Sequence, residues 1–163
     1  EYPDVMGVFR EVCDTPKMAS ITFSHYKMVG VLQAILIASY PYRRGEIPIV
    51  LEMLPETGIN GEGTLHISRD IADGVSHQYK IAASPSSSFR VRLNANYLYA
   101  ALKDMLMPEK AGDALIRFEV PAVIDGGKRL PFVVRSDYYS PAPQTAMIMP
   151  MSFPEGEAGR DDE

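Results

Sequence analysis

The chain has 163 residues, of which 46% are hydrophobic and 23% charged, as expected for one globular domain with its own core. No segment approaches the unbroken run of about 20 apolar residues that a membrane-spanning helix requires. The most apolar segment, 28–38, contains Gly30 and Gln33 and is predicted to be a buried helix. Cys13 is the single cysteine, which excludes an internal disulfide framework and favours a reducing compartment. We therefore expect a cytoplasmic protein.

The net charge of −5 is concentrated at the C-terminal end. Residues 155–163 contain five acidic residues and one arginine, a local balance of −4, so about −1 remains for the rest of the chain. Strongly electrostatic nucleic-acid-binding domains usually carry a concentrated basic face, which this balance argues against. Residues 154–163 are predicted to form an acidic, disordered tail.

The chain contains an internal repeat. Segment 21–36 (ITFSHYKMVGVLQAIL) aligns without a gap with segment 91–106 (VRLNANYLYAALKDML), at an offset of 70 residues. Apolar residues coincide in five pairs: Ile21 and Val91, Phe23 and Leu93, Met28 and Leu98, Leu32 and Leu102, Leu36 and Leu106. Each copy starts with period-two alternation and continues at helical spacing, which predicts a strand that runs directly into a helix. Ser24 and Asn94 stand at the transitions and are predicted N-caps.

Three strand-like segments follow each predicted helix. They are residues 47–53, 64–68 and 78–83 in the first copy, and residues 114–120, 131–135 and 144–149 in the second. The order strand, helix, three strands therefore occurs twice, with halves at about 18–83 and 88–151. This order predicts a duplicated α+β domain in which the two helices pack side by side and antiparallel sheets lie outside them.

The sequence offers few candidates for chemistry. The three histidines (His25, His66 and His77) lack metal-ligand spacing, and no pair of carboxylates is placed for acid–base catalysis. Cys13 lies in a polar stretch, 11–16, that is predicted to be a loop, and we expect a structural thiol. Segment 40–44 (YPYRR) is either an ordinary exposed loop or a contact for single-stranded nucleic acid. We expect no catalytic residue, no cofactor and no metal.

Three short motifs, taken in order, give the chain a resemblance to a known family. They are segments 2–4 (YPD), 93–98 (LNANYL) and 147–151 (MIMPM). They look like the entry segment, the second strand-to-helix junction and the closing strand of the third, C-terminal domain of the bacterial DNA sliding clamp, the β subunit of DNA polymerase III. The resemblance covers residues 1–153 and implies the DNA clamp fold, an α+β fold with pseudo-two-fold symmetry.

The resemblance implies a processivity factor without catalytic activity. Bacterial clamps of this family are homodimeric rings of three-domain chains that encircle double-stranded DNA on the nucleoid without reading its sequence. Helices line the hole, so by this resemblance Lys27 and Lys103, together with Asp104, would face the DNA. A nearly neutral domain suits loose, water-mediated sliding, because topological linkage requires little affinity.

The resemblance also implies a binding site for short peptide motifs of DNA polymerases, the clamp loader and repair proteins, largely between the second and third domains. Carried over residue by residue, the site consists of Pro3, Val8, Asn94, Tyr97, Met147, Ile148, Met149, Pro150 and Met151. Methionine side chains adapt to differing partners, and Tyr97 combines an apolar ring with a hydroxyl. Asn94 can donate and accept hydrogen bonds toward an extended backbone, and Pro150 is expected to end the strand.

The same residues also allow a simpler interpretation. By strand alternation, Met147, Met149 and Met151 share one face and can equally fill the core. Tyr97, one turn into its helix, can equally be a residue at the edge of the core. These alternatives concern packing alone and require no ligand.

Some positions depart from the clamp pattern. Gly7 stands where a basic residue often precedes Val8, and Ser152 and Phe153 stand where a basic and an aliphatic residue are usual. Residues 75–80 (VSHQYK) replace a strand that is usually rich in acids and forms the dimer interface. These changes are expected to alter motif recognition. They leave open a stand-alone adaptor that uses the clamp fold for protein binding, and a small enzyme as a further hypothesis.

Overall fold

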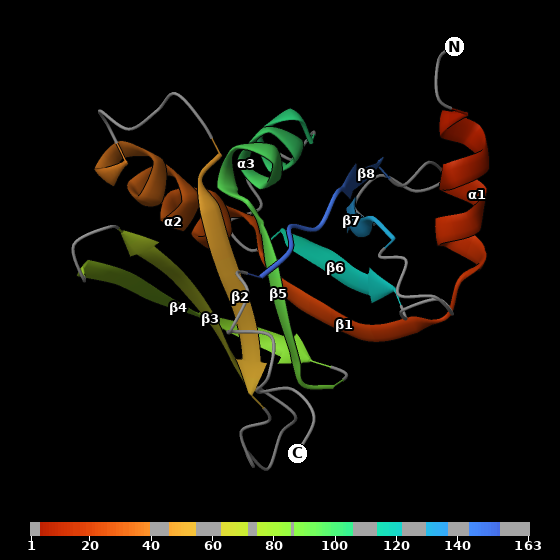
Figure 1. Ribbon diagram of the computed structural model, residues 1–163. Helices are drawn as coiled ribbons and strands as arrows, with labels where there is room; N and C mark the ends of the chain where they lie inside the picture. Colours follow the sequence, from red (N-terminus) through yellow and green to blue (C-terminus); the bar gives the residue numbers. More distant parts are fainter. Residues whose placement is uncertain are drawn as a thin grey trace.

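The computed structural model describes residues 4–39, 46–54, 63–71, 75–85, 87–105, 114–121, 130–136 and 144–153 (Figure 1). Its elements in chain order are α1 (Val5–Asp14), β1 (Lys17–Ser24), α2 (His25–Ala38), β2 (Pro48–Leu54), β3 (Gly63–Ile71), β4 (Val75–Pro85), β5 (Phe89–Asn94), α3 (Ala95–Asp104), β6 (Leu115–Pro121), β7 (Phe132–Ser136) and β8 (Gln144–Ile148). Pro3, segment 40–44 and the predicted tail lie outside the described residues. None of the described helices is both long and apolar enough to span a membrane.

Each strand of the repeat passes directly into its helix at the predicted cap. Ser24 Oγ accepts a hydrogen bond from the amide of Lys27 at 3.4 Å, which caps α2. Asn94 Oδ1 accepts from the amide of Asn96 at 3.0 Å, which caps α3, and from the amide of Ile47 at 3.4 Å. Both predicted N-caps are confirmed, and the second also binds the start of a strand in the other half of the chain.

The buried stripes of α2 and α3 repeat at the 70-residue offset. They consist of Met28, Leu32 and Ile35 in the first half, and of Leu98 and Leu102 in the second, where the buried C-cap residue Met105 stands at the position equivalent to Ile35. Leu36, which the sequence predicts to belong to the stripe, is only partly buried, and its counterpart Leu106 lies outside the described residues. Ile35 takes the place of Leu36, because a helix of 3.6 residues per turn brings positions 28, 32 and 35 to one face.

The pairing of strands shows the same symmetry. The sheet has the order β5-β2-β3-β4-β1-β6-β7-β8, and every pair is antiparallel. The strand before each helix pairs with the strand after the other helix. Thr22 stands opposite Arg117 in β1–β6, and the equivalent residue Arg92 stands opposite Val50 in β5–β2. The predicted duplication of a strand–helix–three-strand unit is therefore confirmed.

Matching hydrogen bonds join the halves where the helices begin. The amide of His25 donates to the carbonyl oxygen of Ala114 at 2.8 Å, and the amide of Ala95 donates to that of Ile47 at 2.8 Å. In each case the first residue of a helix is bonded to the residue just before a strand of the opposite half. The two halves therefore depend on each other for the backbone hydrogen bonds of their helix starts.

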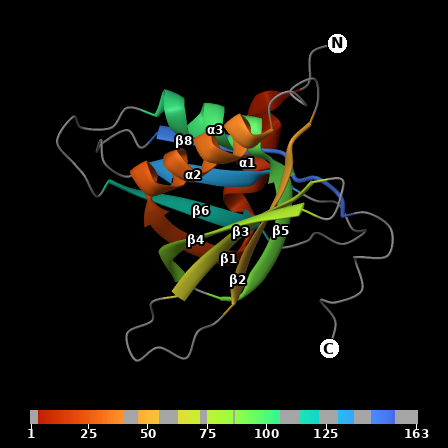
Figure 2. The ribbon, with the colours of Figure 1, turned by 90° about the vertical axis from the view of Figure 1, so that its left-hand side faces the viewer.

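Helices α2 and α3 lie side by side across the strands (Figure 2). Gln33 Nε2 donates to the Tyr99 hydroxyl at 3.1 Å, and the ring Nε2 of His25 lies 2.9 Å from the carbonyl oxygen of Leu102. His25 begins α2 whereas Leu102 lies in the last turn of α3, so the two helices run antiparallel. This arrangement confirms the prediction that the helices pack together inside the strands.

Helix α1 was not expected from the sequence. Cys13, predicted to lie in a loop, is in the last turn of this helix and is exposed, so the loop prediction is wrong. Asp4 caps the helix by accepting a hydrogen bond from the amide of Gly7 at 2.9 Å. Val12 is fully buried beneath it. A tertiary contact of this kind holds a short helix whose isolated stability would be marginal.

Strand β8 ends one residue earlier than predicted. Ile148 stands opposite Phe132, which is the first residue of β7, so no residue of β7 remains to pair further along the chain. The strand alternation predicted for Met147, Met149 and Met151 therefore stops at Ile148. The ladder ends before it reaches the proline that was expected to end it.

The double role of Asn94 leads to a stability prediction. Asn94→Ala removes the cap of α3 and leaves the buried amide of Ile47 without its acceptor, so we expect the free energy of unfolding to fall by about 2 kcal/mol. Ser24→Ala, which removes one cap contact, is the matched control, with an expected loss of about 0.5–1 kcal/mol. Urea denaturation measures both values. Equal losses would contradict the second role of Asn94.

Candidate functional site

The residues around Met147 form a small hydrophobic cluster under α1. The cluster consists of Val12, Leu130, Val133 and the partly buried Met147. Val133 lies in β7 between two residues that face the main core, Phe132 and Val134. Because side chains alternate along a strand, the cluster lies on the opposite face of β7 from the main core. Helix α1 therefore covers the other side of β7 and β8 from α2 and α3 (Figure 1).

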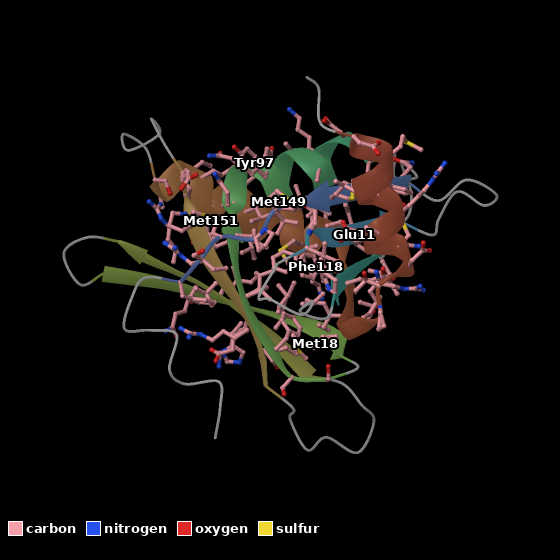
Figure 3. All side chains as sticks on the ribbon, turned by 45° about the vertical axis from the view of Figure 1, so that its right-hand side comes forward. Glu11, Met18, Tyr97, Phe118, Met149 and Met151 are labelled. Atoms are coloured by element: carbon pink, nitrogen blue, oxygen red, sulfur yellow. The ribbon has the colours of Figure 1, made fainter. Side chains whose placement is uncertain are left out.

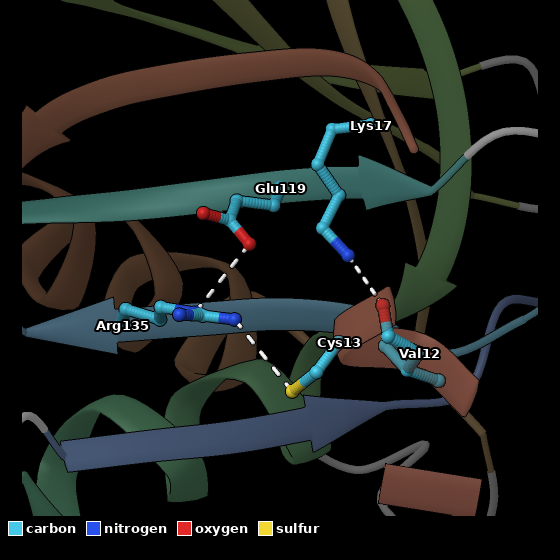
Figure 4. Close-up of polar contacts among 5 residues, drawn as sticks. All are labelled: Val12, Cys13, Lys17, Glu119 and Arg135. Carbon is cyan, nitrogen blue, oxygen red and sulfur yellow. Dashed lines mark hydrogen bonds and ion pairs between the residues drawn. The ribbon is translucent and has the colours of Figure 1, made fainter. Parts of the chain in front are cut away.

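Polar contacts fix the C-terminal end of α1 against the sheet (Figure 4). The Nε atom of Arg135 lies 3.4 Å from Oε2 of Glu119 on the neighbouring strand, and its Nη2 donates to Sγ of Cys13 at 3.8 Å. Lys17 Nζ donates to the carbonyl oxygen of Val12. A cation at this end of a helix compensates carbonyl groups that have no partner within the helix. These contacts determine the position of α1 and of the side chains on its free turns.

Val8 lies one turn before Val12 on α1 and is 38% exposed. Residues four apart share a face of a helix, so Val8 extends the hydrophobic cluster toward the surface. A Cβ atom at the preceding Gly7 would collide with the carboxylate of Asp4, which caps the helix. A side chain at this position would therefore require the carboxylate of Asp4 to shift.

Beyond β8 the chain runs to the free edge of β5 (Figure 1). The amide of Met151 donates to the carbonyl oxygen of Arg92 at 2.8 Å. Two residues later the Phe153 ring lies against the guanidinium group of Arg90, whose central carbon is 4.7 Å from the ring centroid. The segment advances while β5 runs backward, so the two are antiparallel. The same spacing brings Met149 to the C-terminal end of β5, where α3 begins.

Two exposed apolar side chains mark the junction of α3 with this segment. Tyr97, in the first turn of α3, and Met149 are each 59% exposed. Figure 3 shows Tyr97, Met149 and Met151 in one region, on α3 and on the segment after β8. Asn94 at the start of α3 is buried, and its Oδ1 already accepts from two backbone amides. It therefore shapes the site, and only its Nδ2 group would remain to bind a ligand.

The structure describes eight of the nine residues predicted for the peptide site. Six of them form two apolar patches: the α1 patch, with Val8 and the partly buried Met147, and the α3 patch, with the exposed Tyr97 and Met149 and the half-buried Pro150 and Met151. Ile148 lies between the patches, is 2% exposed and belongs to the main core, so it anchors the segment. Pro3 lies outside the described residues. Peptide contact remains a prediction for all of these residues.

Lys27 and Lys103 lie away from both patches, on α2 and α3. Lys27 is in the first turn of α2 and Lys103 in the last turn of α3, and both are exposed. Because the helices are antiparallel, the two lysines lie at the same end of the helix pair. Asp104 is exposed beside Lys103, so this end has a balance of only one positive charge.

The candidate site can offer a ligand apolar contacts and hydrogen bonds. Among the described residues no group of three or more His, Cys, Asp or Glu side chains is placed to hold a metal ion. The α1 and α3 patches contain methionine, valine, tyrosine and proline side chains, which suit a binding surface for an apolar segment of another molecule.

Sequence reasoning missed several residues that build this surface. Val12 follows Val8 at helical spacing after a capping aspartate, a local signal of α1 that the polar residues of 11–16 outweighed in the prediction. Arg90, Arg92 and Phe153 gave no local signal, because Arg92 contacts a residue 60 positions away. Such a contact becomes visible only when the path of the chain is known.

Comparisons with known proteins agree with this geometry. No family model matches the chain, and no curated protein matches it by sequence. Solved structures match 94% of the chain: the β subunit of DNA polymerase from Streptococcus pyogenes (TM-score 0.67, 14% identity), the sliding clamp from Bacillus subtilis (0.65, 20%) and that from Pseudomonas aeruginosa bound to griselimycin (0.63, 15%). The chain has the fold of a sliding-clamp domain. It spans 34–35% of the length of those chains, about one third.

The clamp similarity confirms the predicted fold class. The described residues form an α+β domain with three helices and an eight-stranded antiparallel sheet, as in the matching clamp structures. At identities of 14–20% the similarity concerns the fold alone. Peptide binding, DNA binding and ring formation therefore require their own arguments.

The cluster under α1 leads to a prediction about local stability. Val12→Ala removes two buried methyl groups, so we expect the free energy of unfolding to fall by about 2 kcal/mol. Hydrogen exchange of the α1 amides should accelerate more than that of the α2 amides. Val8→Ala, at an exposed position on the same face, is the control and should change stability by less than about 0.5 kcal/mol. Equal acceleration of hydrogen exchange in α1 and α2 would contradict the view that α1 can detach from the sheet while the rest of the domain stays folded.

Proposed function

We propose that this chain is a domain of a sliding-clamp ring, the third domain as the sequence motifs suggest, and that it binds peptide motifs of DNA polymerases, clamp loaders and repair proteins. The observation that supports peptide binding is the course of segment 147–151. It joins the α1 patch to the α3 patch while Ile148 fixes it in the core. Two apolar patches on one anchored segment suit an extended ligand that places a side chain on each.

The α3 patch is suited to ligands that differ in sequence. Met149 and Tyr97 are each 59% exposed, and methionine is unbranched, flexible and polarizable. The tyrosine ring adds a rigid apolar surface with a polar end. The resemblance places the rest of the site in a neighbouring domain. We therefore expect this chain alone to bind a clamp-binding peptide weakly, with a Kd of about 1 μM or higher.

Peptide binding is testable by titration. A pentapeptide or hexapeptide clamp-binding motif added to the methyl-labelled chain should shift the methyl resonances of Met147, Met149 and Met151. Met149→Ala should weaken binding by about fivefold, as expected for loss of an apolar contact worth about 1 kcal/mol. Met18→Ala is the matched control, because Met18 is 49% exposed on β1 and lies away from Tyr97 and Met149 in Figure 3.

Two results would count against the peptide site. Saturating peptide that moves no methionine signal of segment 147–151 would refute it. An equal loss of affinity in Met18→Ala and Met149→Ala would indicate nonspecific binding to exposed methionines.

The exposed side of the helix pair supports sliding and not tight binding of DNA. Lys27 is the only Lys, Arg, Asp or Glu in α2, and α3 contains only Lys103 and Asp104. Neutralising phosphates releases counterions and gives affinity in proportion to the number of basic contacts. Because this face provides two such groups, retention on DNA would depend on a closed ring.

We accordingly expect the chain alone to bind duplex DNA with a Kd above about 0.1 mM at physiological salt, the weak end of nonspecific binding. Fluorescence anisotropy with a labelled duplex measures this affinity. Lys27→Ala with Lys103→Ala should reduce any binding seen at low salt and lower the salt slope by about 2. Tight, strongly salt-dependent binding by the chain alone would contradict the sliding role.

Ring formation requires an edge that can meet another subunit. Strand β4 pairs with β3 from Val75 to Ala83 but with β1 only at 83–85. Within the described residues, 75–82 therefore present one unpaired backbone edge, which a strand of another subunit can extend. The length of the native polypeptide separates ring from adaptor: a chain of roughly 360 to 400 residues, as expected for three domains, supports a ring, whereas one of about this length supports the adaptor.

A further inference from the structure

The segment after β8 is fastened by side chains of one strand. Arg92 provides its carbonyl oxygen to the amide of Met151 at 2.8 Å, and its Nη1 donates to the carbonyl oxygen of Ser152. Arg90, two residues earlier on the same face of β5, places its guanidinium group over the Phe153 ring at 4.7 Å. Three consecutive residues of the segment are thus bound to two arginines.

The internal symmetry shows what is particular to this place. In the first half, β4 continues past β3 and pairs with β1, with Thr22 opposite Ser84. Adding 70 to Thr22 gives Arg92, and adding 67 to Ser84 gives Met151, so the Met151–Arg92 hydrogen bond is the counterpart of that pair. Strand β4 includes Ser84, whereas β8 ends at Ile148, three residues before Met151. Side chains of Arg90 and Arg92 therefore hold a segment that lies beyond the end of its strand.

We propose that Arg90 and Arg92 are positioning residues of the peptide site, which hold the segment after β8 so that Met149 and Met151 present a fixed backbone to a partner peptide. The inference rests on the proposed peptide binding and assigns it a second set of residues, outside the nine predicted ones. Arg92 acts through the main chain of Met151 and Ser152, and Arg90 acts through the Phe153 ring.

The chemistry of the contacts supports this role. Binding a flexible segment costs conformational entropy, and a segment that is already held loses less of it when the ligand arrives. A cation over an aromatic ring and a charged donor on a carbonyl oxygen both restrict the segment without covering its other face. The side chains of Met149 and Tyr97 remain 59% exposed while the backbone beside them is fixed.

The first experiment measures, without any peptide, how firmly Arg90 and Arg92 hold the segment after β8. Hydrogen exchange of the Met151 amide reports whether the segment is held against β5. Arg90→Ala and Phe153→Ala should each accelerate this exchange by about two- to fivefold, the factor that corresponds to an exposed cation–π contact. Arg90→Lys should recover part of the protection, because a lysine retains the cation but lacks the planar guanidinium. Lys80→Ala, which removes an exposed cation from β4, is the control and should leave the exchange unchanged.

The second experiment measures peptide affinity in the same variants. Arg90→Ala should weaken binding of the clamp-binding peptide by about two- to fivefold, and Arg90→Ala with Arg92→Ala by about tenfold or more. Arg92→Lys keeps a donor for the Ser152 carbonyl and should weaken binding less than Arg92→Ala. Affinity should follow the rate of exchange at Met151 across the series.

Three results would overturn the inference. Unchanged exchange at Met151 in Arg90→Ala and Phe153→Ala would show that the arginines do not hold the segment. Faster exchange with unchanged peptide affinity would show that holding it is irrelevant to binding. Tighter peptide binding in the loosened variants would make the segment a strap that competes with the peptide. Absence of binding in the unmodified chain would instead refute the proposed function itself, and that titration is performed first.

Discussion

The exchange of strands between the two halves is the constraint on which the rest of the structure depends. The strand before each helix pairs with the strand after the other helix, so β1 adds to β6 and β5 adds to β2. The first amide of each helix is bonded to the opposite half in the same way. A single half therefore lacks both a complete sheet and the acceptor for the first amide of its helix. The shared core under α2 and α3 forms only when both halves are present, and it fixes both ends of the sheet, β5 and β8.

The candidate site lies where the symmetry of the halves is broken. In the first half β4 is long enough to pair with β3 and then with β1, which closes that part of the sheet with backbone contacts. In the second half β8 ends at Ile148, and the following segment reaches β5 through the Met151–Arg92 backbone hydrogen bond and the side chains of the two arginines. The interrupted ladder leaves Met149 exposed beside Tyr97.

Sequence periodicity was sufficient for the repeated elements because their signals are local. The alternation before Ser24 and Asn94, and the helical spacing after them, depend on residues within one or two turns. Helix phase was harder to predict: Leu36 fits an apolar stripe in the sequence, yet Ile35 is the fully buried residue and Leu36 is only partly buried. Segment 11–16 read as a loop because its polar residues conceal Val12, which is buried only after β7 and β8 have formed. No local sequence pattern predicts the contact of the Arg90 guanidinium group with the Phe153 ring, because it joins two distant parts of the chain.

The proposed binding surface contains methionines, and such a surface places a particular demand on the backbone beneath it. Methionine side chains adapt to different partners because they have several rotatable bonds, and each bond fixed by a ligand costs entropy. If the backbone were also free, ordering it would add about 1–2 kcal/mol for each residue and would cancel much of the gain from apolar contact. Segment 147–151 avoids this cost at both ends, because Ile148 is buried in the core and Met151 is bonded to β5. Adaptable side chains on a fixed main chain are the arrangement that best reconciles varied partners with measurable affinity.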